Sequence, residues 1–379
     1  MKYLLTKLPS KVINLLITVI VLTAVILYLY FIKFQGNITG FFRIGSILEL
    51  SPFLNPETTK IYQGEIGYDG QQFLSLALDP FLQNSETINT LDHPIYRYRR
   101  ILYPLISYLF SFGNRTLIPY IMVAINCLSI IGIVWIISLY FQSNQEQKWQ
   151  PLLTLCIPGV WIVLSLGTAD LVSSLLLIVS FYCYRYNKPI WTAFTISLAC
   201  LTRETLLLIW LAILFTSIIQ KKKEQSKQLL WAWIPPFLWT IYISALNLSG
   251  TVRVKANFGY PFMGIYNKFI SLFMGEFKGE NLFEAYLFIL IFIIFITIFA
   301  ISAFHRKDNQ LIKFSALLYG AMFVMSSMTI LSYYLDYSRV FIDIYFFLLL
   351  SINTDKIPIK SILFLALGLG SFAFLALHS

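Results

Sequence analysis

The chain has 379 residues, of which 58% are hydrophobic and only 12% are charged, and its mean hydropathy is +0.73. Soluble domains carry about twice that charged fraction, so the composition excludes an ordinary soluble enzyme and predicts an all-α, polytopic membrane protein. The net charge of +10 comes from basic residues scattered over loops, which does not indicate a nucleic-acid-binding domain. The four cysteines lie far apart in apolar runs, and neither a disulfide framework nor a zinc site is implied.

The N-terminus, MKYLLTKLPSK, leads into an apolar run that extends to Phe34. This run is longer than the core of a signal peptide and no small-residue cleavage site follows it, so we expect a retained first span. Similar runs recur to the end of the chain, and together they predict a transmembrane bundle of about eleven spans in one integral-membrane domain, residues 1–379. The predicted spans cover 12–34, 116–141, 151–167, 169–186, 189–202, 204–220, 229–248, 284–304, 310–332, 339–352 and 357–377.

The loops divide unequally between the two sides of the membrane. Residues 101–112, ILYPLISYLFSF, are too short to cross, so we expect an interfacial or re-entrant helix inside a long first extracytoplasmic loop, residues 35–115. With the N-terminus in the cytoplasm, the basic segments KKKEQSK and HRK (305–307) are also cytoplasmic. The polar motifs of the chain then gather on the outer face, which in a bacterium faces away from the cytoplasm across the plasma membrane.

Asp69 lies between two glycines in IGYDGQQFLSLALDP, residues 66–80. Glycines permit a tight turn and a close approach of the backbone to a ligand, and Gln71 then opens an apolar helix. Asp69 could simply cap that helix. If the turn between them is helical, Glu65, four residues earlier, shares a face with Asp69, and the two carboxylates could then hold a divalent cation.

Three arginines, Arg97, Arg99 and Arg100, follow in YRYRRILYP. They could bind anionic lipid headgroups beside an interfacial helix. Alternatively, because guanidinium groups match phosphate oxygens in pairs, they could stabilise a phosphate that leaves during a reaction.

Further charged residues occur at or near membrane depth. Asp170 follows SLGTA at the start of a span, where it could act as a helix cap. Arg203 and Glu204 interrupt an apolar run, and Arg339 lies in YYLDYSRVFID. Charges at membrane depth are costly and are usually paired or functional, so an interhelical ion pair is an alternative to a role in phosphate binding.

A second extracytoplasmic loop is predicted over 249–283. Its segment RVKANFGYPFMGIYNKF mixes cations with aromatic rings, including Tyr260. Such rings can stack on sugars, or they can form an ordinary aromatic belt at the membrane interface.

The motifs GYDGQQFLSLALDP, YRYRRILYP and, more weakly, LTRET resemble the GT-C class of polytopic membrane glycosyltransferases. The chain looks most similar to the bacterial RgtA-type and mannosyltransferase-like branch. The resemblance covers most of the chain in layout, but its residue-level content is concentrated in residues 65–104 and, more weakly, 165–204.

The resemblance implies an inverting enzyme that moves a sugar from a polyprenyl-phosphate donor to a glycan, lipid or protein acceptor of the cell envelope. Asp69 matches the position of the general base, and Asp170 that of a second acidic residue on the outer face. Many members carry paired acidic residues in the first loop, whereas this chain has a single Asp there with Glu65 at a different spacing.

In that interpretation the donor phosphate would meet some of Arg97, Arg99, Arg100, Arg203 and Arg339, and Tyr68, Gln71 and Tyr260 would contact substrate. No cofactor is required, although a divalent cation at Glu65 and Asp69 could assist.

Other functions remain open alternatives. A transporter or flippase of a lipid-linked glycan would also place charges within spans, although paired halves with broken helices are not visible in the sequence. A lipid-binding assembly subunit and, more weakly, a membrane acyltransferase are the remaining possibilities. Asp69→Asn separates them, because only a base-dependent transferase loses its function with that carboxylate.

Overall fold

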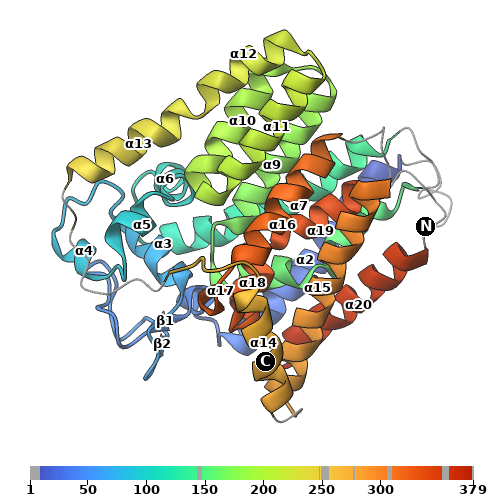
Figure 1. Cartoon of the computed structure of the whole chain (residues 1–379). Coiled ribbons are helices and arrows are strands. Elements are labelled where there is room, and N and C mark those ends of the chain that lie inside the picture. Colours follow the sequence, from blue (N-terminus) through green and yellow to red (C-terminus); the bar gives the residue numbers. More distant parts are fainter. Residues whose placement is uncertain are drawn as a thin grey trace.

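The computed structural model describes residues 9–142, 147–246, 248, 256–275, 278–304, 310–351 and 358–377. Within these ranges the chain is predominantly helical (Figure 1), which confirms the predicted all-α class. The two strands described, β1 (Ile44–Gly45) and β2 (Ile61–Tyr62), pair in parallel over two residues. Part of the second predicted loop, residues 249–255 and 276–277, and the HRK segment lie outside the described residues.

Three helices are long and apolar enough to cross a membrane, and they indicate a membrane protein. The first is α2 (Ser10–Leu27), which continues without a break into the π-helical turn η1 (Tyr28–Lys33). The second is α7 (Ile118–Tyr140) and the third is α15 (Glu280–Phe304). All three coincide with predicted spans. Most of the first helix is partly or fully exposed, and Ile20 and Phe31 are among its exposed residues, as expected for a surface that faces lipid.

The other predicted spans form shorter or interrupted helices. Pro158 starts a helix and Gly167, with a positive φ of 59°, ends it, so the run 151–167 is divided. The number of crossings therefore stays a prediction. The elements in these runs are η4 (Gln150–Cys156), α8 (Pro158–Leu166), α9 (Asp170–Arg185), α10 (Pro189–Thr202), η5 (Glu204–Leu206), α11 (Leu207–Ile219), α12 (Lys223–Ala232), α13 (Ile234–Ala245), α16 (Gln310–Met325), α17 (Met328–Leu331), α18 (Tyr334–Val340), α19 (Ile342–Leu350) and α20 (Pro358–Leu377).

The first long loop folds into short helices on one side of the bundle (Figure 1). The helix over the predicted interfacial segment has nine residues, a length of about 14 Å, which is under half of the ~30 Å of a bilayer core. Its shortness agrees with an interfacial or re-entrant helix rather than a span. The elements of this loop are η2 (Ile38–Phe42), α3 (Asp69–Leu78), α4 (Glu86–Asn89), α5 (Pro94–Tyr98) and α6 (Leu102–Phe110).

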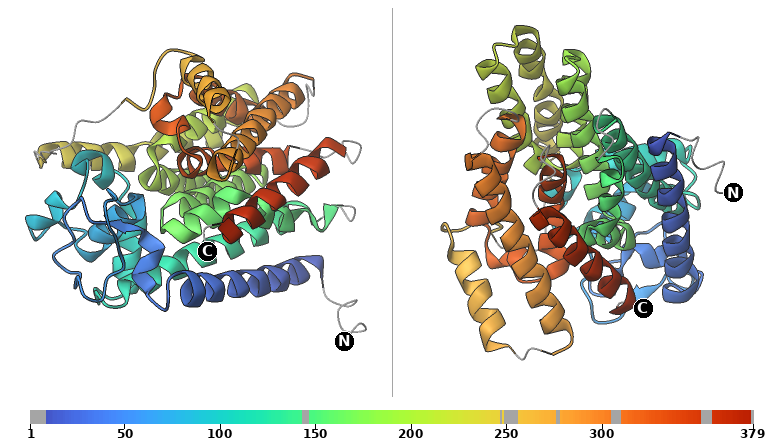
Figure 2. Two further views of the ribbon diagram at one scale, coloured as in Figure 1. Left: turned by 90° about the horizontal axis from the view of Figure 1, so that it is seen from below. Right: turned by 90° about the vertical axis from the view of Figure 1, so that its right-hand side faces the viewer.

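The bundle encloses two helices completely. Every residue of α8 and every residue of α19 is buried. The helix α8 packs against α7, α9, α18 and α20, and α19 packs against α9, α15, α16 and α18. The helices α12 and α13 run along the edge towards the first loop (Figure 1). In two further views, α2 and α20 lie along another side of the molecule (Figure 2). A fully enclosed helix has no face towards solvent, so its sequence is apolar almost throughout, with Asp343 of α19 as an exception.

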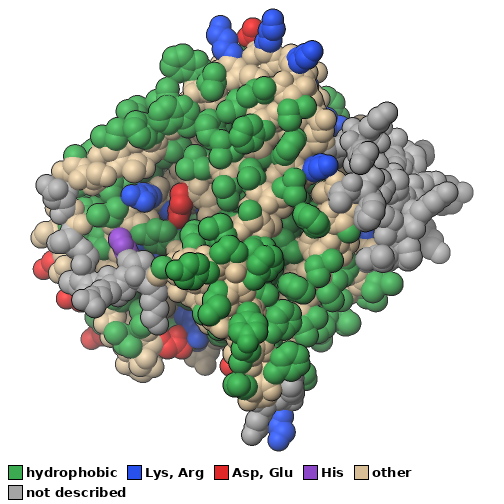
Figure 3. All heavy atoms as spheres, viewed as in Figure 1, with side chains coloured by type: hydrophobic (Ala, Val, Ile, Leu, Met, Phe, Trp, Pro, Cys, Tyr) green, Lys and Arg blue, Asp and Glu red, His purple; other side chains and the backbone are tan. Residues whose placement is uncertain are grey.

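The surface is apolar over most of the face seen in Figure 3, and Lys and Arg side chains gather at the end formed by α12. The exposed apolar side chains include Trp231, Phe237 and Ile241 on α12 and α13. On the opposite side, α14 (Met263–Met274) exposes Tyr266, Phe273 and Met274. Such extended apolar surface on several helices is expected where lipid replaces water as the solvent.

Candidate functional site

The start of α3 places Asp69 inside the protein. Gly67 adopts a positive φ of 86° and turns the chain immediately before the helix. Tyr68, not Asp69, occupies the N-cap position, and Asp69 is the first helical residue. Asp69 is 8% exposed, and its carboxylate turns towards arginines from two distant segments. The alternative that Asp69 merely caps the helix is therefore wrong.

Asp69 makes ion pairs with three arginines. Its Oδ1 lies 2.6 Å from Arg97, its Oδ2 lies 3.8 Å from Arg100, and the same Oδ2 accepts a hydrogen bond from Arg339. Burial by itself would raise the pKa of Asp69, but Arg339, Arg97 and Arg100 outweigh burial and hold that pKa well below its usual range. The carboxyl group is therefore ionised throughout the physiological pH range.

Asp170 lies on the other side of Arg339. It is the first residue of α9 and accepts a hydrogen bond of 2.8 Å from Thr168. Its carboxylate is 3.7 Å from Arg339 and 3.5 Å from Arg203. Arg339 thus bridges the two predicted acidic residues, although they are about a hundred positions apart in the sequence.

Each of these arginines has further partners. Arg97 pairs with Asp92 through two hydrogen bonds of 2.8 and 2.6 Å, and Arg100 pairs with Glu204 through bonds of 2.9 and 2.8 Å. Arg203 approaches Asp343 at 3.4 Å and Arg339 approaches Asp336 at 3.7 Å. We call this set the arginine–carboxylate network. Its members are Arg97, Arg100, Arg203, Arg339, Asp69, Asp92, Asp170, Glu204, Asp336 and Asp343.

Two glycines allow the elements that carry the network to pack closely. A Cβ atom on Gly70 would collide with the backbone carbonyl of Leu166 at the end of α8. A Cβ on Gly159 would lie 2.5 Å from the carbonyl oxygen of Ser338, next to Arg339. Real Cβ contacts are not this short, so α3, α8 and α18 reach their observed separation because these positions lack a side chain.

The structure separates Glu65 from Asp69. Residues 65–68 are not helical, because α3 begins only at Asp69. The expectation that the two carboxylates share a helical face is therefore wrong. Glu65 instead accepts hydrogen bonds of 2.8 and 3.2 Å from Arg43. In the part of the chain that the structure describes, no group of three or more His, Cys, Asp or Glu side chains is arranged to hold a metal ion.

The remaining predicted residues have different environments. Tyr68 donates a 2.5 Å hydrogen bond to Asp336 and its ring lies under Arg339, so it belongs beside the network. Gln71 accepts a hydrogen bond from the Gly45 backbone and ties β1 to α3. Among the described residues, Arg99 makes no ion pair, and Tyr260, which is 85% exposed, makes no hydrogen bond to the network.

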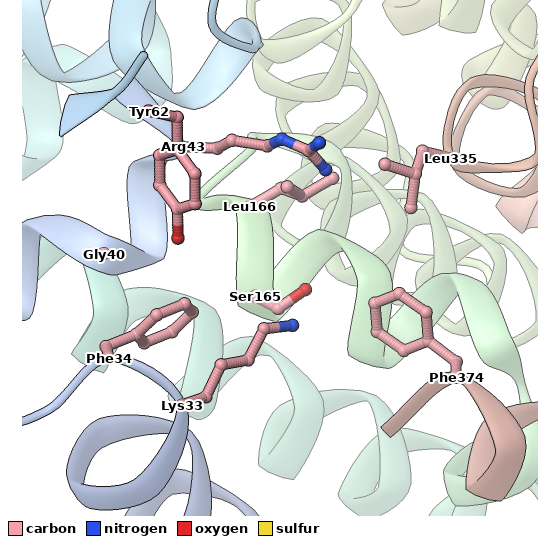
Figure 4. Close-up of a pocket in the computed structure, with 9 residues that line it drawn as sticks. All are labelled: Lys33, Phe34, Gly40, Arg43, Tyr62, Ser165, Leu166, Leu335 and Phe374. Atoms are coloured by element: carbon pink, nitrogen blue, oxygen red, sulfur yellow. The ribbon is translucent and has the colours of Figure 1, made fainter. Parts of the chain in front are cut away.

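A pocket of about 180 Å³ opens beside the network, at the end of the first membrane-crossing helix. Figure 4 shows the Lys33 amine, the Ser165 hydroxyl and the Tyr62 hydroxyl directed into this space, with the Arg43 side chain along one edge. We call it the lysine pocket. It is lined by Lys33, Phe34, Gly40, Arg43, Tyr62, Ser165, Leu166, Leu335 and Phe374.

The network and the lysine pocket share walls. The Arg43 carbonyl accepts a 3.1 Å hydrogen bond from the Tyr68 backbone, so this pocket residue is attached to the start of α3. Leu335 precedes Asp336 in α18. The two regions are therefore adjacent at the junction of the first loop with the bundle.

Sequence reasoning missed several of these residues. The position of Asp92 could have identified it as a member of the network, because a carboxylate five residues before Arg97 can pair with that arginine. Lys33 reads as an ordinary cation at the end of a span, and nothing in the sequence alone distinguishes it from a lysine that extends to the membrane surface. Its place in a pocket depends on α8, α18 and α20, which are distant along the chain.

Comparison of the chain with protein-family models, with curated proteins and with solved structures finds no match. The function is therefore argued from the geometry of the site.

Proposed function

We propose that the protein is a membrane glycosyltransferase of GT-C type that uses a sugar linked to a polyprenyl phosphate, with Asp69 as the general base. The observation that carries this proposal is the convergence of Asp69 and Asp170 with arginines from three separate segments: the first loop, the end of α10, and α18. Six of the site residues that the sequence predicts meet in this one network. A carboxylate beside phosphate-binding guanidinium groups is what transfer of a sugar from a phosphate carrier requires.

The chemistry balances without a cofactor. The acceptor hydroxyl oxygen attacks the anomeric carbon, and the new C–O bond forms as the bond between that carbon and the phosphate oxygen breaks. The leaving polyprenyl phosphate takes the bonding electrons and its charge is met by arginine. Asp69 accepts the proton of the acceptor hydroxyl, and displacement from the opposite face inverts the anomeric centre.

The ion pairs of Asp69 give this proposal a specific requirement. A carboxylate whose pKa is held low is a poor base, because general bases work best with a pKa near the operating pH. The phosphate of the donor competes with Asp69 for the same guanidinium groups. When Arg339 or Arg97 turns to that phosphate, Asp69 loses its strongest partners and its pKa rises. Donor binding thus prepares the base.

The experiment is a transfer assay with purified full-length protein and a panel of polyprenyl-phosphate sugars, with release of the carrier as the readout. Asp69→Asn should lower the rate of carrier release by about 10²–10⁴-fold, the usual contribution of a general base. Glu57→Gln is the matched control, because Glu57 is an exposed acidic residue of the same loop. If Asp69→Asn moves lipid-linked glycan across vesicles as well as the wild type and no donor releases its carrier, the protein is a flippase.

The same proposal fixes the site in the membrane. About eleven crossings with a cytoplasmic N-terminus place the network on the outer face, where an envelope acceptor is available. Cysteine labelling of a variant with a single introduced cysteine at exposed Glu57 tests this orientation. An impermeant reagent should label it in right-side-out spheroplasts, whereas labelling only after lysis would contradict it.

A further inference from the structure

The lysine pocket contains positive charge that the protein itself does not neutralise. Arg43 pairs with Glu65, but among the described residues neither Lys33 nor Lys60 has a carboxylate within ion-pair distance. The Lys60 Nζ donates a 3.0 Å hydrogen bond to the Lys33 backbone carbonyl, so the two lysines are adjacent. Arg43 and Lys60 are close enough to repel the Lys33 ammonium. Lys33 and Arg43 line the pocket and Lys60 lies beside it, so three cations stand against one carboxylate, an excess of two positive charges.

Burial makes this excess costly. Lys33 and Arg43 are only partly exposed, and the aromatic rings of Phe34 and Phe374 lie within 5.6 and 5.5 Å of the Lys33 Nζ. Like charges held together next to apolar walls repel one another more strongly than they do in water. An anion in the pocket would remove this repulsion, and the nitrogen and hydroxyl groups around it are donors suited to several oxygen atoms.

The position of the pocket identifies the kind of anion. Lys33 is the last residue of the 24-residue apolar helix that is long enough to cross a membrane. The ends of such helices lie at the depth of lipid headgroups. The neighbouring side chains of that helix, Phe31 and Ile32, are 63% and 65% exposed, and Phe372 on α20 is 74% exposed. Exposed apolar surface is therefore present next to the pocket on both η1 and α20.

We propose that the lysine pocket binds the phosphate group of a lipid, with Lys33, Lys60 and Arg43 as the charged donors and Tyr62 as a neutral one. The apolar chain of that lipid would lie along the exposed faces of α2 and α20. The inference goes beyond the proposed function and does not rest on it, because phosphate binding here requires no reaction at Asp69. Two sources share this chemistry, a polyprenyl phosphate and a glycerophospholipid of the membrane.

The test is calorimetric titration of the full chain, purified in a neutral detergent, with farnesyl phosphate, with phosphatidic acid and with inorganic phosphate. We expect both lipid phosphates to bind more tightly than inorganic phosphate. Lys33→Gln and Lys60→Gln should each weaken lipid-phosphate binding at least tenfold. Lys11→Gln is the matched control, because Lys11 is a half-buried lysine at the opposite end of the helix that ends at Lys33. The affinity of this control variant for lipid phosphate should equal that of the wild type.

Each outcome decides a part of the proposal. If farnesyl phosphate binds more tightly than phosphatidic acid, the pocket is assigned to a polyprenyl carrier. If phosphatidic acid binds more tightly than farnesyl phosphate, the pocket is assigned to a membrane phospholipid. Equal affinity for inorganic phosphate overturns the lipid assignment, and unchanged affinity in both lysine variants overturns the site. If Lys33→Gln does not fold, Lys60→Gln carries the test, since Lys60 lies in the loop before β2.

The result is separable from the proposed function. Normal phosphate binding without sugar transfer from any donor rejects only the transferase. Sugar transfer that depends on Asp69, together with unchanged lipid-phosphate affinity in Lys33→Gln and Lys60→Gln, rejects only the pocket.

Discussion

In the arginine–carboxylate network, each of the four arginines lies within ion-pair distance of at least two carboxylates. At the lysine pocket, neither Lys33 nor Lys60 lies within ion-pair distance of any carboxylate among the described residues. Both regions are partly or fully buried and they share walls, so the difference is one of pairing rather than of depth. Four arginines against six carboxylates give the network an excess of two negative charges. The pocket has the opposite excess.

The difference assigns different tasks to the two regions. A site with unpaired cations attracts an anion in its resting state, because binding relieves repulsion. A site whose cations are already paired binds an anion only by exchange of partners, and each exchange changes the pKa of the carboxylate that is released. The pocket is thus suited to holding a lipid phosphate, while the network is suited to coupling the arrival of a phosphate to the basicity of Asp69.

The largest difference between the two regions is expected in stability. Arg339→Met removes the shared partner of Asp69, Asp170 and Asp336 and leaves buried charge uncompensated. The free energy of unfolding should therefore fall by about 3–5 kcal/mol. Lys33→Met leaves no carboxylate without a partner and should change the free energy of unfolding by less than about 1 kcal/mol. The measurement is the unfolding midpoint in detergent, followed by tryptophan fluorescence.

A double variant sharpens this test. Arg339→Met combined with Asp69→Asn removes both charges of one pair, so its destabilisation should be smaller than the sum of the two single effects by about 0.5–3 kcal/mol. Additive effects would mean that Arg339 and Asp69 do not depend on each other, and the comparison of paired with unpaired charge would fail.

The neighbouring arginines of the first loop allow the same comparison within one segment. Arg100 is 8% exposed and makes two hydrogen bonds to Glu204, whereas Arg99 makes no ion pair among the described residues. Arg100→Gln should destabilise the protein by about 2–3 kcal/mol, and Arg99→Gln by no more than about 0.5 kcal/mol. The two midpoints measured under identical conditions check this, and a reversed order would contradict the pairing.

Acid should weaken the network in a predictable direction. Asp69 has a folded-state pKa well below the unfolded value of about 3.9, so its ion pairs contribute stability that is fully present above that value. This contribution is lost as the pH falls below about 4 towards the folded-state pKa. Burial tends to raise the pKa of Asp92, but Arg97 outweighs burial and lowers it, so Asp92 acts in the same direction.

The comparison of wild type with Asp69→Asn isolates the effect of Asp69. Asp336, whose pKa is raised by burial, acts in the opposite direction but is present in both proteins. The difference between their unfolding midpoints should be constant from pH 7 to about 5 and should shrink on further acidification. A difference that does not change with pH would show that Asp69 is not the group that titrates.

The sequence allowed the principal helices and the meeting of charges to be predicted, for one physical reason. In an apolar chain, charged side chains at membrane depth are usually paired or functional, so Arg203 and Arg339 were expected to have partners, and the structure places carboxylates beside both. The individual pairs could not be predicted, because Arg339 could have met any of several carboxylates. The choice depends on how closely α8 approaches α18, which the glycine at 159 permits.

The helix interruptions were not predictable for a different reason. The run 151–167 is apolar throughout, and a helix buried on all sides has no periodic polar positions to mark where it ends. Pro158 and Gly167 were visible, but both residues also occur inside transmembrane helices. Lys33 was hidden for the same reason, since its apolar neighbours in the sequence do not reveal the pocket walls contributed by α8, α18 and α20.

A small effect on stability is also expected at the boundary between the two regions. The Arg43–Glu65 pair is partly exposed, with 27% and 37% of the two side chains accessible, so Glu65→Gln should lower the free energy of unfolding by no more than about 1 kcal/mol.

Glu65→Gln also removes the one carboxylate that pairs with a cation of the pocket, and it raises the excess positive charge there from two to three. Glu65→Gln should therefore bind farnesyl phosphate or phosphatidic acid more tightly than the wild type, and the gain should decrease as salt is added. Glu57→Gln, which removes an equal charge from an exposed position of the same loop, separates this local effect from the net charge of the protein. If Glu65→Gln binds lipid phosphate less tightly than the wild type, the role of Glu65 is to position Arg43 and not to neutralise its charge. The excess positive charge would then not be what attracts the phosphate.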